Sequence, residues 1–209
     1  MNILIIGATR GIGAQLLNQA LSKEHHVTVL ARDPASLERN DEHLRILRGD
    51  ILEADVVDRA VEGQHAVCVT IGRGPTRGPV SLFSEGAKNV IATMKRHSVS
   101  KLVCVTGIGA GDSKGHGGFF YDKIVTPLLL KTSYEDKDVQ EALVTESELE
   151  WVIIRPGFLT NGPRTEQYRV LTELQGVKAG NISRADVAHF ILSQLESMTH
   201  LSKTPLLMY

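Results

Sequence analysis

The sequence has little cysteine, few aromatic residues and no long apolar run. Its 209 residues include only Cys68 and Cys104, each inside an apolar stretch, where a free thiol behaves as a small buried hydrophobe. Cysteine and histidine do not occur at the spacing of a metal site, so we expect no bound metal. No apolar run approaches the roughly 18 residues that a membrane span needs. These absences favour a soluble, cytoplasmic protein.

Net charge is also nearly absent. The 23 basic and 24 acidic residues give a net charge of −1 and are interspersed without a long block of one sign. Nucleic acids and anionic membranes attract basic patches, so neither is an expected partner, and the expected ligands are small molecules. At this length we predict one domain, residues 1–209, with only a small substrate-binding portion.

Short apolar runs alternate with amphipathic stretches along almost the whole chain. This pattern is typical of parallel strands that are buried on both faces and joined by helices. We predict strands over residues 2–7, 26–31, 43–48, 65–71, 101–106, 151–155 and 204–208. Helices are predicted near 12–24, 34–40, 53–62, 81–98, 119–147 with a break at Pro127, and 183–197. The predicted fold class is α/β, a doubly wound sheet that binds ligands outside the carboxyl ends of its strands.

The first predicted strand is followed directly by GATRGIG, which opens the first helix. A strand-to-helix turn favours glycine whether or not anything binds, so a plain turn is the alternative. Here, however, the N–H groups at the helix start face outward, and their partial positive charge favours a diphosphate. Gly7 would make the turn, Gly11 would admit the phosphate and Gly13 would let helix and strand pack closely. The predicted nucleotide cradle also contains Thr9, Arg10 and Ile12.

The end of the second predicted strand indicates which dinucleotide is bound. An acidic residue at this place binds the ribose 2′-hydroxyl of NAD, but the strand end reads VTVLARDP and its first polar residue is Arg32. A guanidinium is permanently charged and binds two phosphate oxygens at once, so Arg32 suits the 2′-phosphate of NADP, with Arg10 closing from the loop. The alternative is an exposed pair of Arg32 with Asp33 or with solvent. The pattern favours NADP (NADPH) as the cofactor.

Two further strand ends are candidate cofactor contacts, with ordinary strand termini as the alternative. After the third predicted strand, Asp50 and Ile51 would contact the edge and the face of an adenine. After the fourth, Thr70, Ile71 and Gly72 would lie along the ribose. Together they would place the cofactor across the carboxyl edge of the sheet.

Several motifs in order carry a family resemblance: the glycine loop, VLARD, GDIL, VCVTIG, KLVCVTGIGAGDSKG, EDKDVQEAL, LEWVIIRPGFLTNGP and ISRADVAHFIL. Together they resemble the short-chain dehydrogenase/reductase superfamily over essentially the whole chain. The most similar branch is the atypical one with flavin reductase/biliverdin-IXβ reductase and NmrA-like cofactor sensors. The resemblance implies a Rossmann fold with a mostly parallel central sheet, flanking helices and a minimal substrate subdomain. The G-x-x-x-G-x-G spacing departs from that branch and matches the tyrosine-dependent dehydrogenases.

The catalytic signature of those tyrosine-dependent members is matched in part. They share a Tyr-x-x-x-Lys on the helix after the fifth strand and a Ser or Thr near the strand end. Thr106 matches the hydroxyl and Lys137 the lysine, but the tyrosine slot holds Ser133, and Tyr134 follows it. In the matched pattern the lysine binds the nicotinamide ribose and lowers the pKa of the tyrosine, which transfers the substrate proton. Tyr134 is the candidate acid, and a surface or packing role is the alternative.

The segment GIGAGDSKGHGGFFYDK follows the fifth predicted strand, where the nicotinamide is expected. Phe119, Phe120 and Tyr121 offer a flat apolar surface on which a planar acceptor would stack. The alternative is that Phe119 and Phe120 start a helix and pack into the core. His116 is a candidate acid, and a solvated side chain is its alternative.

After the sixth predicted strand, RPGFLTNGP matches the segment that in relatives passes beside the nicotinamide. The resemblance implies that Pro156, Gly157 and Phe158 pack against it. We assign Arg155 no role in the site and expect it to pair simply with an acid at the strand end.

Residues and resemblance together predict an NADP-dependent reductase. It would transfer hydride from NADPH to a small-molecule acceptor that is planar or carries a carbonyl, such as a flavin or a quinone. Flavins and linear tetrapyrroles can take the proton from solvent, so the resemblance implies a reaction without a dedicated acid. The rival is an NmrA-like sensor that binds NADP and changes its affinity for a protein partner without turnover. An isomerase or dehydratase that uses the cofactor transiently fits the small substrate portion less well.

Overall fold

A computed structural model describes residues 1–37, 41–74, 76 and 78–209. Its strands are β1 (Asn2–Ile6), β2 (His26–Ala31), β3 (Leu44–Arg48), β4 (Ala66–Val69), β5 (Lys101–Val105), β6 (Glu150–Pro156), β7 (Phe158–Thr160), β8 (Arg169–Leu171), β9 (Asn181–Ser183) and β10 (Leu206–Met208). Its α-helices are α1 (Gly11–Ser22), α2 (Ala54–Val61), α3 (Leu82–Arg96), α4 (Lys131–Thr145) and α5 (Arg184–Ser197). Two short 3-10 turns, η1 (Pro34–Leu37) and η2 (Gly111–Ser113), and a π-helical segment, η3 (Tyr121–Leu130), complete the described elements.

Eight of the strands form one sheet in the order β3-β2-β1-β4-β5-β6-β10-β8. Strands β3 to β10 of this order pair in parallel, and β8 is added antiparallel to β10 at the edge. Strands β7 and β9 pair separately, in parallel. The prediction of a doubly wound Rossmann fold with a mostly parallel sheet flanked by helices is therefore confirmed. From β1 the chain continues to β2 on one side and later returns to β4 on the other, which makes the β1/β4 boundary the switch point of the sheet.

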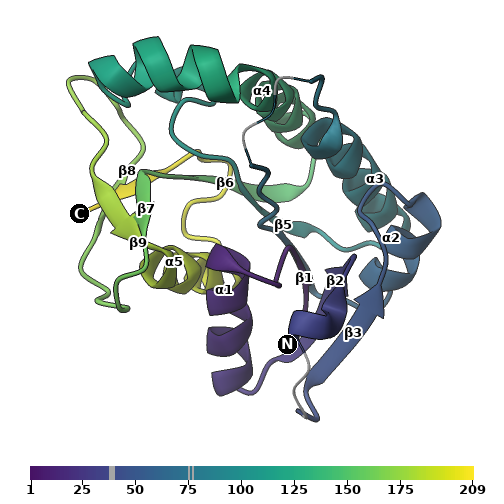
Figure 1. Ribbon diagram of the computed structural model, residues 1–209. Coiled ribbons are helices and arrows are strands. Elements are labelled where there is room, and N and C mark those ends of the chain that lie inside the picture. The colour runs from purple at the N-terminus through teal and green to yellow at the C-terminus, as the bar shows by residue number, and fades with distance from the viewer. Residues whose placement is uncertain (38–40, 75, 77) are drawn as a thin grey trace.

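Helices cover both faces of the sheet, with α1 and α5 on one face and α2, α3 and α4 on the other (Figure 1). Alternate residues of a strand point to opposite faces, so Ile3 and Ile5 of β1 join the core under α1 and α5, and Leu4 joins the opposite core. Cys68 and Cys104 are buried, one in each core, as predicted. Burial on both faces explains why the strands read as unbroken apolar runs.

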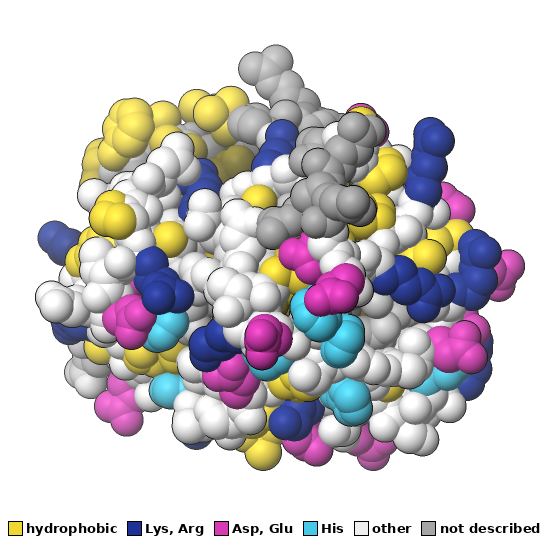
Figure 2. All heavy atoms as spheres, turned by 90° about the horizontal axis from the view of Figure 1, so that it is seen from below, with side chains coloured by type: hydrophobic (Ala, Val, Ile, Leu, Met, Phe, Trp, Pro, Cys, Tyr) yellow, Lys and Arg dark blue, Asp and Glu magenta, His cyan; other side chains and the backbone are white. Residues whose placement is uncertain are grey.

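The outer surface is mixed in charge on the face that Figure 2 shows. Acidic, basic and histidine side chains are interspersed there, which agrees with the balanced composition. Within the described part of the chain, no helix combines the length and the apolar character that a bilayer span requires.

Two predicted helices differ from the structure. The helix predicted over 34–40 is the 3-10 turn Pro34–Leu37, and residues 38–40 lie outside the described residues. The helix predicted over 119–147 is divided into η3 and α4 at Leu130, whose backbone (φ −122°, ψ −3°) leaves the helical region. Pro127 lies inside η3 and lacks the N–H of a regular turn, so the wider winding accommodates it.

The structure also contains three strands that the sequence did not predict. Strands β7, β8 and β9 have three residues each, which is too short for an alternating pattern to be recognised. The pairing of Phe158 with Asn181 and of Thr160 with Ser183 holds the chain after β6 against the start of α5. This small sheet therefore brings the first residue of α5 to the carboxyl edge of the large sheet.

Candidate functional site

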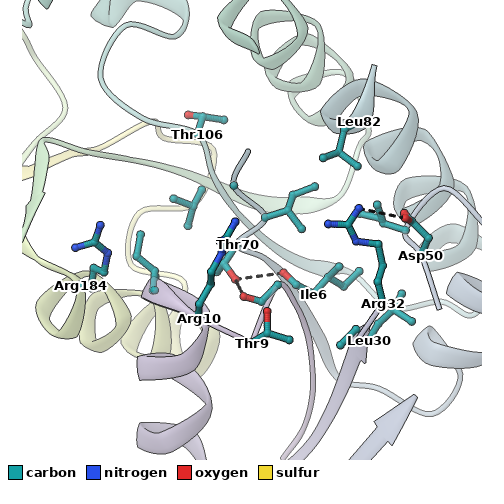
Figure 3. A pocket seen from close by; sticks show the side chains of 18 of the residues that line it. Ile6, Thr9, Arg10, Leu30, Arg32, Asp50, Thr70, Leu82, Thr106 and Arg184 are labelled. Atoms are coloured by element: carbon teal, nitrogen blue, oxygen red, sulfur yellow. Dashed lines mark hydrogen bonds and ion pairs between the residues drawn. The ribbon is translucent and has the colours of Figure 1, made fainter. Parts of the chain in front are cut away.

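A cavity of about 630 Å³ opens along the carboxyl ends of the parallel strands, where β1 and β4 meet (Figure 3). Its wall runs from the ends of β2 and β1 past β4 to the ends of β5 and β6, and it includes the starts of α1, α3 and α5 and Lys137 of α4. Open α/β sheets bind their ligands at this switch point. The cavity is therefore the candidate functional site.

Most of the residues predicted from the sequence line this cavity. From the glycine loop these are Gly7, Thr9, Arg10, Gly11 and Ile12. From the ends of β2 to β4 they are Arg32, Asp50, Ile51, Thr70, Ile71 and Gly72. From the far end they are Thr106, Lys137 and Pro156. Four predicted residues, Gly13, Tyr134, Gly157 and Phe158, are not part of the cavity wall.

Two glycines of the loop have conformations or contacts that no other residue tolerates. Gly7 has φ +102°, and a β-carbon there would approach the Ile71 nitrogen to 2.9 Å. A β-carbon on Gly13 would collide with the Gly7 carbonyl oxygen, so Gly13 lies behind the cavity and lets α1 pack on the loop. Thr70 Oγ1 donates to the Ile6 carbonyl at 3.2 Å and ties the end of β4 to the loop. The loop is thus held close to the sheet below the cavity.

The start of α1 presents free backbone donors to this cavity. Arg10, the residue before the helix, has an extended backbone, and its side chain does not cap the first turn. The first turn carries no acidic residue. The N–H groups at the start of a helix have no partner within it, and the helix dipole adds a partial positive charge. This middle part of the cavity therefore suits an anionic group such as a phosphate.

A second cationic position lies at the end of β2. The Arg32 guanidinium is 3.8 Å from the Asp50 carboxylate, and 76% of its side chain is exposed. Of the two alternatives predicted from the sequence, the ion pair is with Asp50 and not with Asp33, and contact with solvent is found over most of the side chain. An exposed pair of this kind contributes about 0–1 kcal/mol, so it leaves the guanidinium available to an anion.

The hydroxyl of Thr106 is engaged by a buried carboxylate that the sequence did not single out. Thr106 Oγ1 donates to Glu141 Oε1 at 2.6 Å. The Arg155 guanidinium donates to the same carboxylate, at 3.0 Å from Nε to Oε1 and 2.6 Å from Nη2 to Oε2, and also pairs with Asp112. The pairing of Arg155 with an acid is thus confirmed. This network fixes the ends of β5 and β6 against α4.

Lys137 stands one helical turn before Glu141 and reaches the cavity beside Thr106. Its ammonium group donates to the Thr106 carbonyl and lies 5.2 Å from the centre of the Tyr134 ring. Burial lowers the pKa of Lys137 to about 8, against the opposing effect of the Glu141 carboxylate. The lysine is therefore a cationic donor at the far end of the cavity that loses its charge at a moderately alkaline pH.

Tyr134 differs from the tyrosine of the matched pattern. Its hydroxyl lies 2.9 Å from the Tyr121 hydroxyl. Burial raises the pKa of Tyr134 far above its ordinary range, and it also raises the pKa of Tyr121. The raised pKa of Tyr134 differs from the lowered tyrosine pKa of the matched pattern, because desolvation, the Tyr121 hydroxyl and the Glu141 carboxylate all act in the same direction.

The segment after β5 has one side chain facing inward and two facing solvent. The Tyr121 ring packs edge-on against Phe158 at 5.2 Å between ring centres. Phe119 and Phe120 start the helical segment, as the alternative expected, but they are 80% and 67% exposed, so they do not pack into the core. His116 is half-buried, and its Nδ1 lies 2.8 Å from the Val177 carbonyl oxygen.

Phe158 and its neighbour have structural contacts outside the cavity. Phe158 is the first residue of β7 and packs its ring against Tyr121 of η3, and a β-carbon on Gly157 would collide with the Gly180 carbonyl oxygen. Of the segment predicted to pass beside a nicotinamide, Pro156 is the residue on the cavity wall.

Several lining residues were missed by the sequence prediction. The apolar ones, among them Leu30, Leu82 and Val105, belong to the ends of predicted elements and carry no distinguishing signal. Asn161 and Arg184 reach the cavity through the β7–β9 pairing, which the sequence did not reveal.

Comparison of the chain with known proteins shows the family to which it belongs. A family model described as NAD(P)H-binding matches residues 7–198. The uncharacterised protein YwnB of Bacillus subtilis (strain 168) is 27% identical over 218 residues, which cover 96% of this chain and 94% of YwnB.

Two solved structures share the fold. ChuY, an anaerobillin reductase from Escherichia coli O157:H7, has a TM-score of 0.85 at 22% identity and covers 100% of this chain and 97% of its own. A wide-type short-chain dehydrogenase/reductase from Veillonella parvula, solved in complex with NADP, has a TM-score of 0.80 at 18% identity and covers 100% and 94%.

Proposed function

This chain belongs to the NAD(P)H-binding family, and from that membership we propose that it is an NADPH-dependent reductase acting on a planar or carbonyl acceptor such as a flavin or a quinone. The observation that carries the proposal is the cavity at the switch point. One end holds Arg32, the middle holds the uncapped start of α1, and the far end holds Lys137. This order of cationic groups matches the 2′-phosphate, the diphosphate and the nicotinamide ribose of NADPH.

The residues present fit this cofactor group by group. The amides at the start of α1, with Arg10, bind the diphosphate, and Arg32 exchanges its weak pair with Asp50 for the 2′-phosphate. Lys137 donates to a ribose hydroxyl beside Thr106. When bound, NADPH supplies the hydride. The task of the chain is to hold the dinucleotide across the sheet edge and to keep its reactive end next to the acceptor.

The proton of the reduction comes from solvent in this proposal. Tyr121 and Tyr134 both have raised pKa values and share their hydroxyl contact, so neither is an activated acid. The Thr106 proton is donated to Glu141. A flavin or quinone that has received a hydride is basic enough to take its proton from water, which completes a two-electron reduction.

The acceptor side of the proposal rests on the exposed aromatic pair before η3. Phe119 and Phe120 are exposed, and the next residue, Tyr121, packs against Phe158 directly after β6. Solvent-exposed aromatic rings offer a stacking surface to a planar molecule. These contacts favour a flat acceptor over a small aliphatic substrate.

An NADP sensor without turnover is the rival function, and the raised pKa of Tyr134 is the observation that favours it. Purified protein is incubated with NADPH and a panel of flavins, quinones and dichlorophenolindophenol, and the loss of NADPH absorbance is followed. The proposal expects acceptor-dependent oxidation of NADPH. NADPH binding without oxidation by any acceptor would favour the sensor, and absence of NADPH binding would contradict both functions.

A further inference from the structure

Arg184 is a cavity residue to which neither the sequence motifs nor the family pattern gave a role. It is the first residue of α5, and its side chain points into the cavity (Figure 3). Its Nε and Cδ lie 3.8 Å and 3.9 Å from the position that a β-carbon would take on Gly11. Gly11 is the first residue of α1. The guanidinium of Arg184 therefore lies over the helix start that presents free amides.

Neutral groups hold the Arg184 side chain in this position. Its Nη1 donates to Asn161 Oδ1 at 2.8 Å and approaches the Leu159 carbonyl oxygen at 3.5 Å. Among the residues that the structure describes, no carboxylate forms an ion pair with Arg184. A guanidinium has five N–H donors, so several remain for a ligand. The side chain is thus oriented by the chain itself while its charge is left uncompensated.

The location of this positive charge is unfavourable without an anion beside it. A cation near the N-terminus of a helix is repelled by the helix dipole, and Arg184 lies at the start of α5 and over the start of α1. The acidic residue in the first turn of α5 is Asp186, but its carboxylate accepts hydrogen bonds from Thr165 and Tyr209. The start of α5 is capped by Ser183, whereas the start of α1 beneath the guanidinium is uncapped, so a bound anion would offset both the guanidinium and the α1 dipole.

We propose that Arg184 binds the diphosphate of the dinucleotide and closes the cradle opposite the sheet, an inference that rests on the proposed function. The α1 amides bind the diphosphate from one side, and the planar guanidinium of Arg184 binds it from the other. Asn161 orients this guanidinium, so the small β7–β9 sheet is coupled to cofactor binding. Because NADPH, NADH and ADP-ribose share the diphosphate, Arg184 stabilises all three equally, whereas Arg32 acts on NADPH alone.

The test compares the affinities of Arg184→Gln and Arg32→Ala for NADPH, NADH and ADP-ribose by calorimetry. Arg45→Gln is the matched control, because Arg45 is an exposed arginine of β3 outside the cavity. Because Arg184→Gln loses charge-assisted hydrogen bonds, it should weaken the binding of all three ligands by about ten- to hundredfold. Arg184→Lys keeps the charge and loses the planar pair of N–H donors, so it should weaken the binding less. Arg45→Gln should bind like the wild type.

Thermal unfolding separates ligand binding from a structural role. Without ligand, Arg184→Gln should melt at the wild-type temperature or above it, because the variant removes a cation from two helix N-termini. The stabilisation that NADPH adds should be smaller in the variant. A lower melting temperature with unchanged affinity, or a loss confined to NADPH, would overturn the role of Arg184. A wild type that binds none of the three ligands would overturn the proposed function as well.

Discussion

The hydroxyl oxygens of Tyr121 and Tyr134 lie 2.9 Å apart, in a pair that joins the start of η3 to α4. Tyr134 stands one residue after the slot that the tyrosine-dependent dehydrogenases use, and its partner is another phenol. Burial raises the pKa of both side chains, so both stay protonated at neutral pH. In the proposed function the pair is therefore a hydrogen-bonded support beside Lys137, and the proton comes from solvent.

Tyr134→Phe should leave the reduction of flavins nearly unchanged. The variant removes one hydroxyl and keeps the ring against Lys137, and solvent still supplies the proton. The measurement is kcat with a flavin at saturating NADPH, with Tyr121→Phe as the matched variant from the same pair. A general acid contributes roughly 10²–10⁴-fold, so a hundredfold fall in Tyr134→Phe alone would return the tyrosine to the mechanism.

Arg32→Ala should weaken the binding of NADPH and leave NADH nearly unaffected. The guanidinium loses only a weak, exposed pair with Asp50 when it turns to the 2′-phosphate, so most of the new interaction is retained as affinity. The expected loss for NADPH is about 1.5–3 kcal/mol, as for hydrogen bonds to charged groups. Calorimetric titration with both dinucleotides measures it. Equal losses for NADPH and NADH would contradict the assignment of the 2′-phosphate.

The parts of the site predicted from the sequence are those formed by short, continuous segments. The glycine loop, Arg32 at the end of β2 and Thr70 at the end of β4 each follow an apolar strand, and parallel strands bring such ends to one edge. Local chemistry and fold pattern were sufficient there.

The parts that were missed depend on contacts between distant segments. In the sequence, Glu141 does not differ from other charged helix residues. Its role depends on the hydrogen bonds that Thr106 and Arg155 donate to its carboxylate. Arg184 reaches the cavity through the pairing of β7 with β9, which are three residues long. The pKa of Tyr134 is set by burial, and burial of one helix face against η3 cannot be derived from spacing alone.

Glu141→Gln should destabilise the fold. The Arg155 side chain is 4% exposed and Glu141 is 8% exposed, so removal of the carboxylate leaves a buried guanidinium with Asp112 as its remaining acidic partner. Loss of one member of a buried ion pair costs about 3–5 kcal/mol. The free energy of unfolding in urea measures this effect.

Glu85→Gln is the matched control for this substitution, because Glu85 pairs with Lys88 at 2.7 Å on the exposed face of α3. That variant should lose about 1 kcal/mol at most. Similar losses in the two variants would show that the Glu141 network does not hold the ends of β5 and β6 in place.

The last prediction concerns the pH dependence of Lys137. Its pKa is lowered to about 8 in the folded protein, so the side chain is a cation below pH 8 and neutral above it. In the proposed function the ammonium binds the nicotinamide ribose, and kcat/KM for NADPH should therefore fall as the pH rises through about 8. A pH profile of kcat/KM reports groups of the free enzyme.

Lys137→Met provides the comparison, since it keeps an apolar stem over the rings of Phe83 and Tyr134 and removes the charge. The variant should start from a lower kcat/KM and show no fall near pH 8, because the group that titrates there is gone. A fall near pH 8 of equal size in the variant would assign the titration to another group. The ammonium would then have no part in holding the cofactor, and Lys137 would serve α4 packing through its hydrogen bond to the Thr106 carbonyl.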